Sequence, residues 1–197
     1  MKRILLSGVS GGLVLLIWGN LTWMVLPLHM PTIKGLPNES DVSAALKDVE
    51  SGVYVAPWST NEADWSNPES EFMKRHESGP LYSIFIKKQG GAAMDPSMFL
   101  GGFIINFLAA SLAACLLSSA VRGSAYSYMQ CVGFVFGLGL IVALLAHLNY
   151  WNWMNFDLGY TIGWVIDVSV GCGLMGLPIA AIIKPQTIDE STSSPEA

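Results

Sequence analysis

The sequence predicts an all-α membrane protein, a four-transmembrane-helix bundle with a small α/β extracytoplasmic cap between helices 1 and 2. Of its 197 residues, 52% are hydrophobic and only 13% are charged, whereas about a quarter of the residues of a soluble domain are charged. Of the 10 basic and 15 acidic residues, only Asp167 lies inside a long apolar run. This pattern excludes a soluble enzyme, a secreted disulfide scaffold and a nucleic-acid-binding domain.

Four apolar runs of 22 to 26 residues predict the four spans: Ile4–Leu26, Met98–Val121, Ser127–Leu148 and Leu158–Ile183. At about 1.5 Å per residue each run extends roughly 33 to 39 Å as a helix, which is enough to cross a hydrocarbon core of about 30 Å. The first run follows Met1-Lys2-Arg3 and exceeds the roughly 7 to 15 apolar residues of a signal-peptide core. We therefore expect an uncleaved signal-anchor helix.

The chain divides into four parts at the ends of these runs. We expect an N-terminal signal-anchor helix (1–26), the extracytoplasmic cap (27–97), a three-helix unit that completes the bundle (98–183) and a disordered cytoplasmic tail (184–197). Lys2, Arg3, Arg122 and Lys184 all fall on one side of the membrane in this arrangement. Because short cytoplasmic segments are enriched in Lys and Arg, we expect both termini to be cytoplasmic.

The cap has the pattern of two short helices and two short strands. Asn38 precedes an amphipathic segment, Glu39–Glu50, and Pro68 begins a second helical segment capped by Asn67 and running through Glu69–Glu77. The strands are Val53–Ala56 and Leu81–Lys88, and Asp95-Pro96 has the pattern of a cap for the second span. So small a unit has few apolar residues for a core of its own, so we expect it to rest on the bundle or on a partner. Its 6 basic and 10 acidic residues argue against a nucleic-acid partner.

Each span places one strongly polar residue on a face of small residues, the kind of face along which membrane helices pack. In the fourth span Gly159, Gly163, Asp167 and Gly171 follow one another at i+4 spacing. The other spans repeat the pattern, with these members: Gly8, Gly12 and Asn20; Gly102, Asn106, Ala110 and Ala114; Gly139, Ala143 and His147. We expect the polar intramembrane cluster Asn20, Asn106, His147 and Asp167 to point into the outer half of the bundle.

Three interpretations of this cluster remain open. In the first, hydrogen bonds among Asn20, Asn106 and Asp167 form a structural clamp that fixes helix register. In the second, Asp167 is the proton acceptor or ligand-binding carboxylate of an outward-facing pocket, with His147 at its mouth. In the third, Asp167 faces lipid. Because a carboxylate at this depth is costly by about 2.5 to 3.5 kcal/mol on insertion scales, we expect it to have a partner, with Asn20 and Asn106 as the natural candidates.

Aromatic residues gather at the outer ends of the spans. They form an interfacial belt or a platform for a flat apolar ligand or a partner subunit, and spacing alone does not separate these roles. The predicted aromatic outer rim consists of Tyr150, Trp151, Trp153, Phe156, Tyr160 and Trp164.

Catalytic and cofactor motifs are absent from the sequence, which contains no phosphate-binding glycine loop, GxSxG, HExxH or CxxC. His29 and His147 lie at the outer ends of spans and would permit a bis-histidine haem, but Pro27 and Pro31 keep His29 off a regular helix. No zinc-ligand spacing occurs. We therefore expect neither catalysis nor a resident metal, with haem or quinone as the alternative cofactors.

Two stretches resemble small four-span bacterial inner-membrane proteins of unknown function. They are Gly19-Asn20-Leu21-Thr22-Trp23 with Leu26-Pro27-Leu28-His29, and His147-Leu148-Asn149-Tyr150-Trp151-Asn152-Trp153. The resemblance implies a bacterial inner-membrane location and no activity.

Two functional hypotheses follow from the sequence. The first is a non-enzymatic accessory or assembly subunit that docks other membrane proteins. The second is a protein that binds a small apolar or redox ligand, quinone or haem, in an outward-facing pocket near Asp167 and His147. The lipid bilayer is a partner under both hypotheses.

Overall fold

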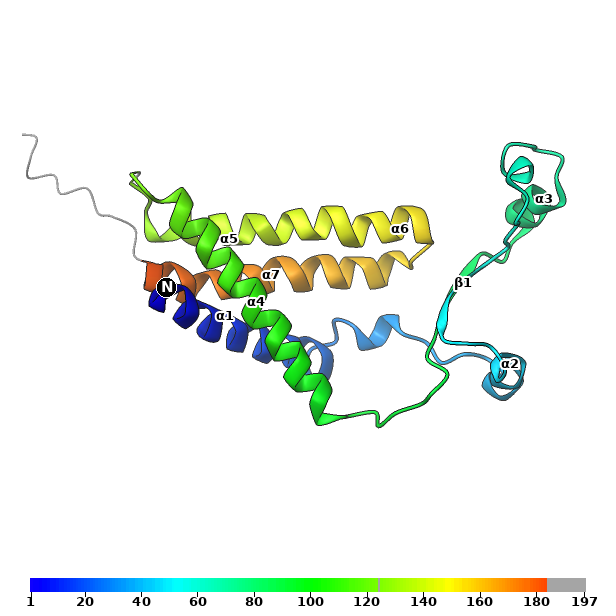
Figure 1. The fold of residues 1–197 in the computed structure, drawn as a ribbon, viewed down its shortest axis with the longest axis horizontal. Helices are drawn as coiled ribbons and strands as arrows, with labels where there is room; N and C mark the ends of the chain where they lie inside the picture. The colour runs from blue at the N-terminus through cyan, green and yellow to red at the C-terminus, as the bar shows by residue number, and fades with distance from the viewer. Residues whose placement is uncertain (124, 184–197) are drawn as a thin grey trace, which may run out of the picture.

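The fold contains four long apolar helices and a small α/β insert between the first and second of them (Figure 1). The computed structural model describes residues 1–123 and 125–183. The predicted disordered tail, 184–197, lies outside the described residues. The four helices are long and apolar enough to cross a membrane, which makes this chain a multi-pass membrane protein. The spans are Lys2–Val25, Pro96–Ala120, Tyr128–Met154 and Leu158–Ile183.

Two of the four spans change helical pitch near the end from which the insert leaves. The first consists of α1 (Lys2–Asn20) followed by a π-helical turn, Leu21–Val25. The third consists of α5 (Tyr128–Val142), a π-helical segment (Ala143–Leu148) and α6 (Asn149–Met154). The remaining spans, α4 (Pro96–Ala120) and α7 (Leu158–Ile183), are single α-helices. As predicted, Asp95 caps α4, accepting a hydrogen bond from the Ser97 backbone N–H at 2.8 Å.

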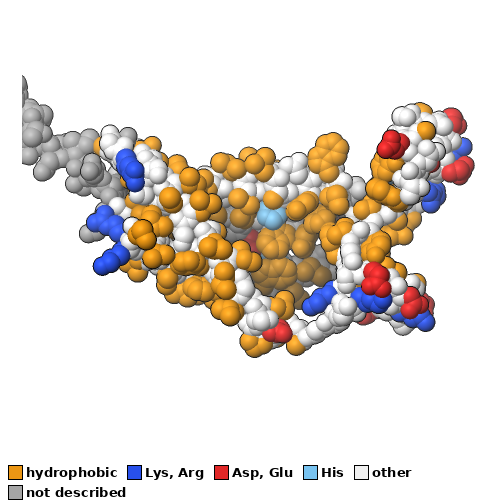
Figure 2. All heavy atoms as spheres, viewed as in Figure 1, with side chains coloured by type: hydrophobic (Ala, Val, Ile, Leu, Met, Phe, Trp, Pro, Cys, Tyr) orange, Lys and Arg blue, Asp and Glu red, His pale blue; other side chains and the backbone are white. Residues whose placement is uncertain are grey.

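The helix α7 is the centre of the bundle. It packs against α1 on one side and α5 on the other, while α4 lies obliquely across α1 (Figure 1). The core of the bundle joins all three spans after the first, with fully buried members Ala110, Ala114, Leu117, Cys131, Val135, Ile179 and Ala180. Hydrophobic side chains cover the outside of the helices between basic side chains at one end and the insert at the other (Figure 2). This apolar surface is the one that contacts the lipid bilayer.

The small residues predicted as packing ridges do bring helices close together. A Cβ atom added at Gly12 of α1 would lie 3.0 Å from the Phe107 backbone of α4, and one at Gly139 of α5 would lie 3.0 Å from the Val168 carbonyl of α7. Ala110 and Ala114 of α4 are fully buried. Gly102 differs from its ridge neighbours, because a Cβ there would meet nothing within 4 Å.

The insert consists of α2 (Glu39–Leu46), β1 (Gly52–Ala56), α3 (Glu71–Ser78), β2 (Tyr82–Ile86) and two 3-10 turns. The strands form an antiparallel pair in which Val53 lies opposite Phe85. One capping prediction was wrong, and the other is right in its position but not in its side-chain bond. Ser70 rather than Asn67 caps α3, accepting from the Met73 N–H, and Asn38 has a left-handed backbone and makes no side-chain cap bond.

The insert stands away from the bundle instead of resting on it (Figure 1). Its own small core surrounds Phe72, which is 3% exposed and packs against Trp65 with ring centroids 4.4 Å apart. The faces of the two-stranded ribbon remain open, with Val53 and Phe85 about 60% exposed. Because an isolated two-stranded sheet is marginally stable in water, the open faces of this ribbon are suited to packing against another surface.

Candidate functional site

The chain folds back over α7 directly after the first span. The π-helical turn ends at Leu26, whose backbone is extended, and a 3-10 turn follows at Met30–Thr32. Thr32 closes this turn through its hydroxyl, which donates to the His29 carbonyl at 2.7 Å. Gly163 makes the approach possible, because a Cβ there would lie 3.1 Å from the Leu28 carbonyl oxygen. The fold-back segment carries His29 into the bundle.

His29 is the partner of the intramembrane carboxylate. Its Nε2 atom lies 2.8 Å from Oδ2 of Asp167, with His29 completely buried and Asp167 only 7% exposed. The backbone carbonyl of Asp167 accepts a second long-range bond from the indole N–H of Trp18, at 3.0 Å. Asp167 therefore faces the interior of the bundle, which excludes the lipid-facing interpretation.

The predicted partners of Asp167 were wrong. The Asn20 carboxamide donates to the carbonyl of Leu16 on its own helix, at 2.7 Å. Asn106 is half-buried on α4 beside Gly12, and no hydrogen bond joins its side chain to another described residue. A clamp does connect the first and last spans, but an imidazole supplies it. The signal in the sequence was a histidine just after the first span, because an imidazole N–H is a hydrogen-bond donor that a buried carboxylate can accept from.

Two tryptophans enclose the buried imidazole. Trp23 stacks on His29 with ring centroids 4.4 Å apart and planes 14° apart, and Trp164 packs on it at 4.9 Å. His147 stacks on Trp164 at 5.2 Å, so it joins the cluster through this indole. Of the four predicted cluster residues, Asp167 and His147 lie beside His29 and Trp164. Asn20 lines a cavity that adjoins this cluster, whereas Asn106 lies deeper, against α1.

Four residues of the predicted aromatic rim contact one another in a continuous row, and the other two lie outside this row. Tyr150 stacks with Phe156 at 5.4 Å, Phe156 contacts Tyr160 at 5.9 Å, and Tyr160 meets Trp164 at 6.3 Å. Trp151 and Trp153 are 44% and 75% exposed, the disposition of a membrane-interface belt. The rim thus has both an inward part, which ends at Trp164, and an outward part.

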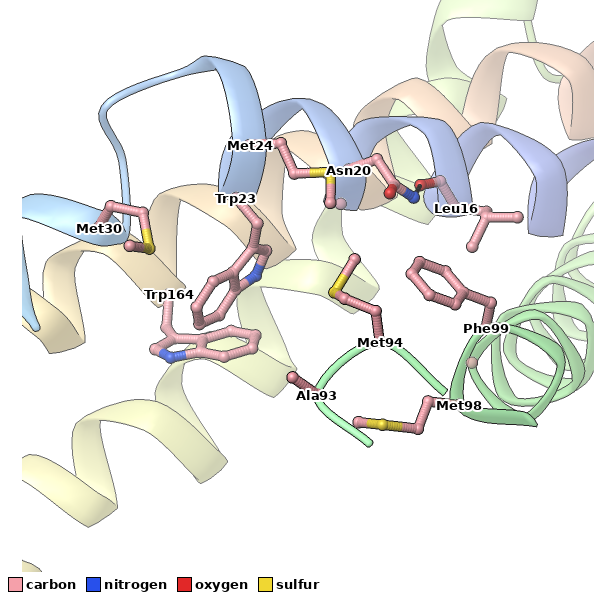
Figure 3. Close-up of a pocket in the computed structure, with 12 residues that line it drawn as sticks. Leu16, Asn20, Trp23, Met24, Met30, Ala93, Met94, Met98, Phe99 and Trp164 are labelled. Atoms are coloured by element: carbon pink, nitrogen blue, oxygen red, sulfur yellow. Dashed lines mark hydrogen bonds between the residues drawn. The ribbon is translucent and has the colours of Figure 1, made fainter. Parts of the chain in front are cut away.

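A cavity of about 780 Å³ lies beside this cluster, between the end of the first span, the start of α4 and Trp164 (Figure 3). Its lining is apolar apart from Asn20 and the indole nitrogens of its tryptophans, and four methionines contribute to it. The residues that line it are Leu16, Gly19, Asn20, Trp23, Met24, Met30, Ala93, Met94, Met98, Phe99, Gly102 and Trp164. The methionines and the open position at Gly102 are features that the sequence reasoning missed.

The tryptophans make the cavity and the buried pair neighbours. Trp23 and Trp164 both line the cavity and both contact His29, and their ring centroids lie 5.8 Å apart with the ring planes at 66° (Figure 3). The His29–Asp167 pair therefore lies directly behind the aromatic wall. Because both partners are buried and bonded to each other, the pair holds this wall in place.

Metal and haem chemistry find little support in this geometry. Among the described residues, no group of three or more His, Cys, Asp or Glu side chains could hold a metal ion. A bis-histidine haem would need a ring nitrogen of His29 facing outward, but Nε2 is bonded to Asp167 and Nδ1 is buried.

Comparisons with protein-family models, curated proteins and solved structures give no match to this chain.

Proposed function

We propose that this multi-pass membrane protein binds a small planar apolar ligand in the cavity between the first span and α4. The observation that carries the proposal is the lined cavity of about 780 Å³. Ligand sites in proteins are clefts of roughly 300 to 1,000 Å³ with mostly apolar and aromatic linings and a few placed polar groups. This cavity fits that description in size, lining and polarity.

The lining favours a flat ring over a saturated chain. Trp23 and Trp164 meet nearly at right angles, so a planar ligand can stack on one indole while its edge meets the other. Met24, Met94 and Met98 surround the remaining sides with flexible, polarisable thioethers that make favourable contacts with ring edges. A quinone-type head group with its apolar tail in the bilayer satisfies these contacts. Haem is not proposed, since neither nitrogen of His29 is available to an iron.

The glycines that border the cavity provide the test. Gly102 lines the cavity and a Cβ there meets nothing within 4 Å, so the side chain of Gly102→Leu starts in open space at the cavity wall. Gly101, the preceding residue on α4, has equally open surroundings but lies outside the lining. Gly101→Leu is therefore a matched control with the same change in helix propensity.

The experiment measures decylubiquinone binding to the protein in lipid nanodiscs by quenching of tryptophan fluorescence. Quinones partition into lipid, so the comparison among variants carries the test. We expect saturable quenching in the wild type and in Gly101→Leu, and at least tenfold weaker binding in Gly102→Leu. Equal quenching in all three proteins would mean that the probe is in the lipid and not in the cavity.

A second function, docking of another membrane protein as an accessory or assembly subunit, is supported by the insert. One face of its ribbon presents Val53 opposite Phe85, both exposed and apolar. We expect Phe85→Asp to release a protein that co-purifies stoichiometrically in mild detergent. Leu36→Asp, at a similarly exposed apolar residue outside the ribbon, should retain it, and loss in both variants or in neither would argue against docking through this face.

We further propose that the chain resides in a bacterial inner membrane with both termini cytoplasmic. The distribution of basic residues supports the orientation. Lys2, Arg3 and Arg122 lie at the end of the bundle opposite the insert, and basic residues in short segments favour the cytoplasmic side (Figures 1 and 2). The insert, and with it the cavity, then lies toward the outer face.

A further inference from the structure

The cavity presents one hydrogen-bond donor that no described residue satisfies. In Figure 3 the indole nitrogen of Trp23 lies on the ring edge that faces the cavity, whereas the nitrogen of Trp164 lies on the far side of its ring. Trp18, by contrast, uses its indole N–H within the protein, donating to Asp167. The Trp23 N–H is therefore available to a ligand.

Asn20 supplies a matching acceptor. Its side-chain nitrogen donates to the Leu16 carbonyl at 2.7 Å, and this bond fixes which end of the carboxamide is the oxygen. The oxygen points away from Leu16 and accepts no hydrogen bond from another described residue (Figure 3). The lining of the cavity is otherwise apolar, so these two polar groups define its only specific contacts among the described residues.

We propose that the ligand carries a hydroxyl group that accepts a hydrogen bond from the Trp23 indole N–H and donates one to the Asn20 carboxamide oxygen. This inference rests on the proposed ligand-binding function and specifies its ligand class: a planar ring alcohol, such as a phenol or a reduced quinol, embedded in the membrane. A hydroxyl both donates and accepts, so a single hydroxyl has the two bonds that these protein groups require.

The same pair of groups discriminates against oxidised or capped relatives of the ligand. A quinone carbonyl or a methyl ether accepts from Trp23 but has no proton to donate to Asn20. The Asn20 oxygen then remains unpaired in an apolar site, which lowers affinity. The cavity is accordingly selective for the reduced, hydroxyl-bearing form.

A matched pair of stable probes tests the hydroxyl requirement. Para-decylphenol and para-decylanisole differ by one methyl group that removes the donor proton, and neither oxidises readily. Their dissociation constants are measured on the full-length protein in nanodiscs by calorimetry, against empty nanodiscs as the partition control. One net hydrogen bond corresponds to about a two- to tenfold difference in Kd, and we expect the phenol to bind tighter by that factor.

Variants assign the difference to the two groups. Asn20→Ala should bring the phenol-to-anisole ratio to about one, because no carboxamide oxygen then distinguishes the two probes. Asn106→Ala, a half-buried asparagine outside the cavity lining, should keep the ratio of the wild type. Trp23→Phe retains an aromatic ring against His29 and should weaken both probes, because both accept from the indole N–H.

The outcomes separate this inference from the function on which it rests. Equal binding of phenol and anisole to the wild type would overturn the hydroxyl requirement and leave ligand binding intact. Failure of both probes to bind above the empty-nanodisc background would overturn the proposed function itself. The wild-type ratio decides the question even where a variant does not fold.

Discussion

The Nε2 atom of His29 and the Oδ2 atom of Asp167 lie 2.8 Å apart inside the bundle, although 138 positions separate the two residues in the chain. The contact ties the segment that follows the first span to the middle of α7. It gives the one charged residue within the four apolar runs a buried partner, and it supports the aromatic wall of the cavity. Its contact with His29 thus accounts for the polar residue Asp167 in the last span.

Substitution of Asp167 should reveal how much this contact stabilises the bundle. Asp167→Ala leaves the buried Nε2 of His29 without a partner, which should lower the free energy of unfolding by about 1 to 3 kcal/mol. Asp167→Asn should stay within about 1 kcal/mol of the wild type, since an amide oxygen can still accept from the imidazole N–H. Unfolding in detergent, followed by circular dichroism, measures both.

The His29→Ala/Asp167→Ala double variant provides the control. If the pair interacts as described, the double variant should lose clearly less than the sum of the two single losses. Additive losses would show that the 2.8 Å contact contributes no coupling.

Close approach of α1 to α4 predicts an unusual response to adding a methyl group. A Cβ at Gly12 would lie 3.0 Å from backbone atoms of Phe107, which cannot move aside as a side chain can. Gly12→Ala should therefore destabilise the bundle by about 1 to 3 kcal/mol, despite the better helix propensity of alanine. Gly137→Ala on α5, where a Cβ meets nothing within 4 Å, should be neutral or stabilising. The same unfolding measurement in detergent compares them, and a neutral Gly12→Ala would contradict the packing.

The orientation can be read by labelling single cysteines in intact cells. In a background with Cys115, Cys131 and Cys172 changed to Ala, Glu62→Cys in the insert should react with a membrane-impermeant maleimide. Ala125→Cys, in the exposed α4–α5 connection, should react only after the cells are lysed. The reverse pattern would place the insert and the cavity on the cytoplasmic side.

The cap of α4 predicts a measurable titration outside the membrane-spanning segment. Ser97 holds the pKa of Asp95 below its ordinary value of 3.8, through hydrogen bonds from its hydroxyl and its backbone N–H to the carboxylate. Because the folded-state pKa is lowered, the ionised carboxylate stabilises the helix start above about pH 4. This stabilisation is lost as the pH falls through the folded-state pKa. Carboxyl NMR in micelles should show Asp95 titrating below 3.8 and shifting upward in Ser97→Ala. A value unchanged by that variant would contradict the contribution of the Ser97 hydroxyl, since the backbone N–H bond of the cap is present in both proteins.

Much of this fold could be predicted from composition and spacing. The four spans follow from apolar length, and the predicted fourth span, Leu158–Ile183, matches α7 in both bounds. The ridge through Gly163 and Gly171 follows from i+4 spacing, because small residues permit the backbone contacts that hold membrane helices together. The cap at Asp95-Pro96 follows from the stereochemistry of helix starts.

The site could be predicted only in part, because it depends on where a loop goes. Pro27 and Pro31 indicate that His29 is off a regular helix, but they do not indicate that the loop turns back onto α7. Asp167 required a partner, and spacing favoured Asn20 and Asn106, which share its depth. Asp167 instead pairs with an imidazole, whose ring N–H can donate to a carboxylate oxygen just as an amide N–H can. The cavity could not be predicted from the sequence either, because it arises where α4 diverges from α1 near Gly102.

The most direct test of the ligand-binding claim is native mass spectrometry of the protein purified from its own membranes in mild detergent. Wild type, Gly101→Leu and Gly102→Leu are released into the gas phase under identical conditions, and the bound small molecules are weighed and fragmented. We predict that the first two retain the same planar apolar molecule and that Gly102→Leu has lost it. The same set of bound molecules on all three proteins, or none on any of them, would contradict a ligand site in this cavity.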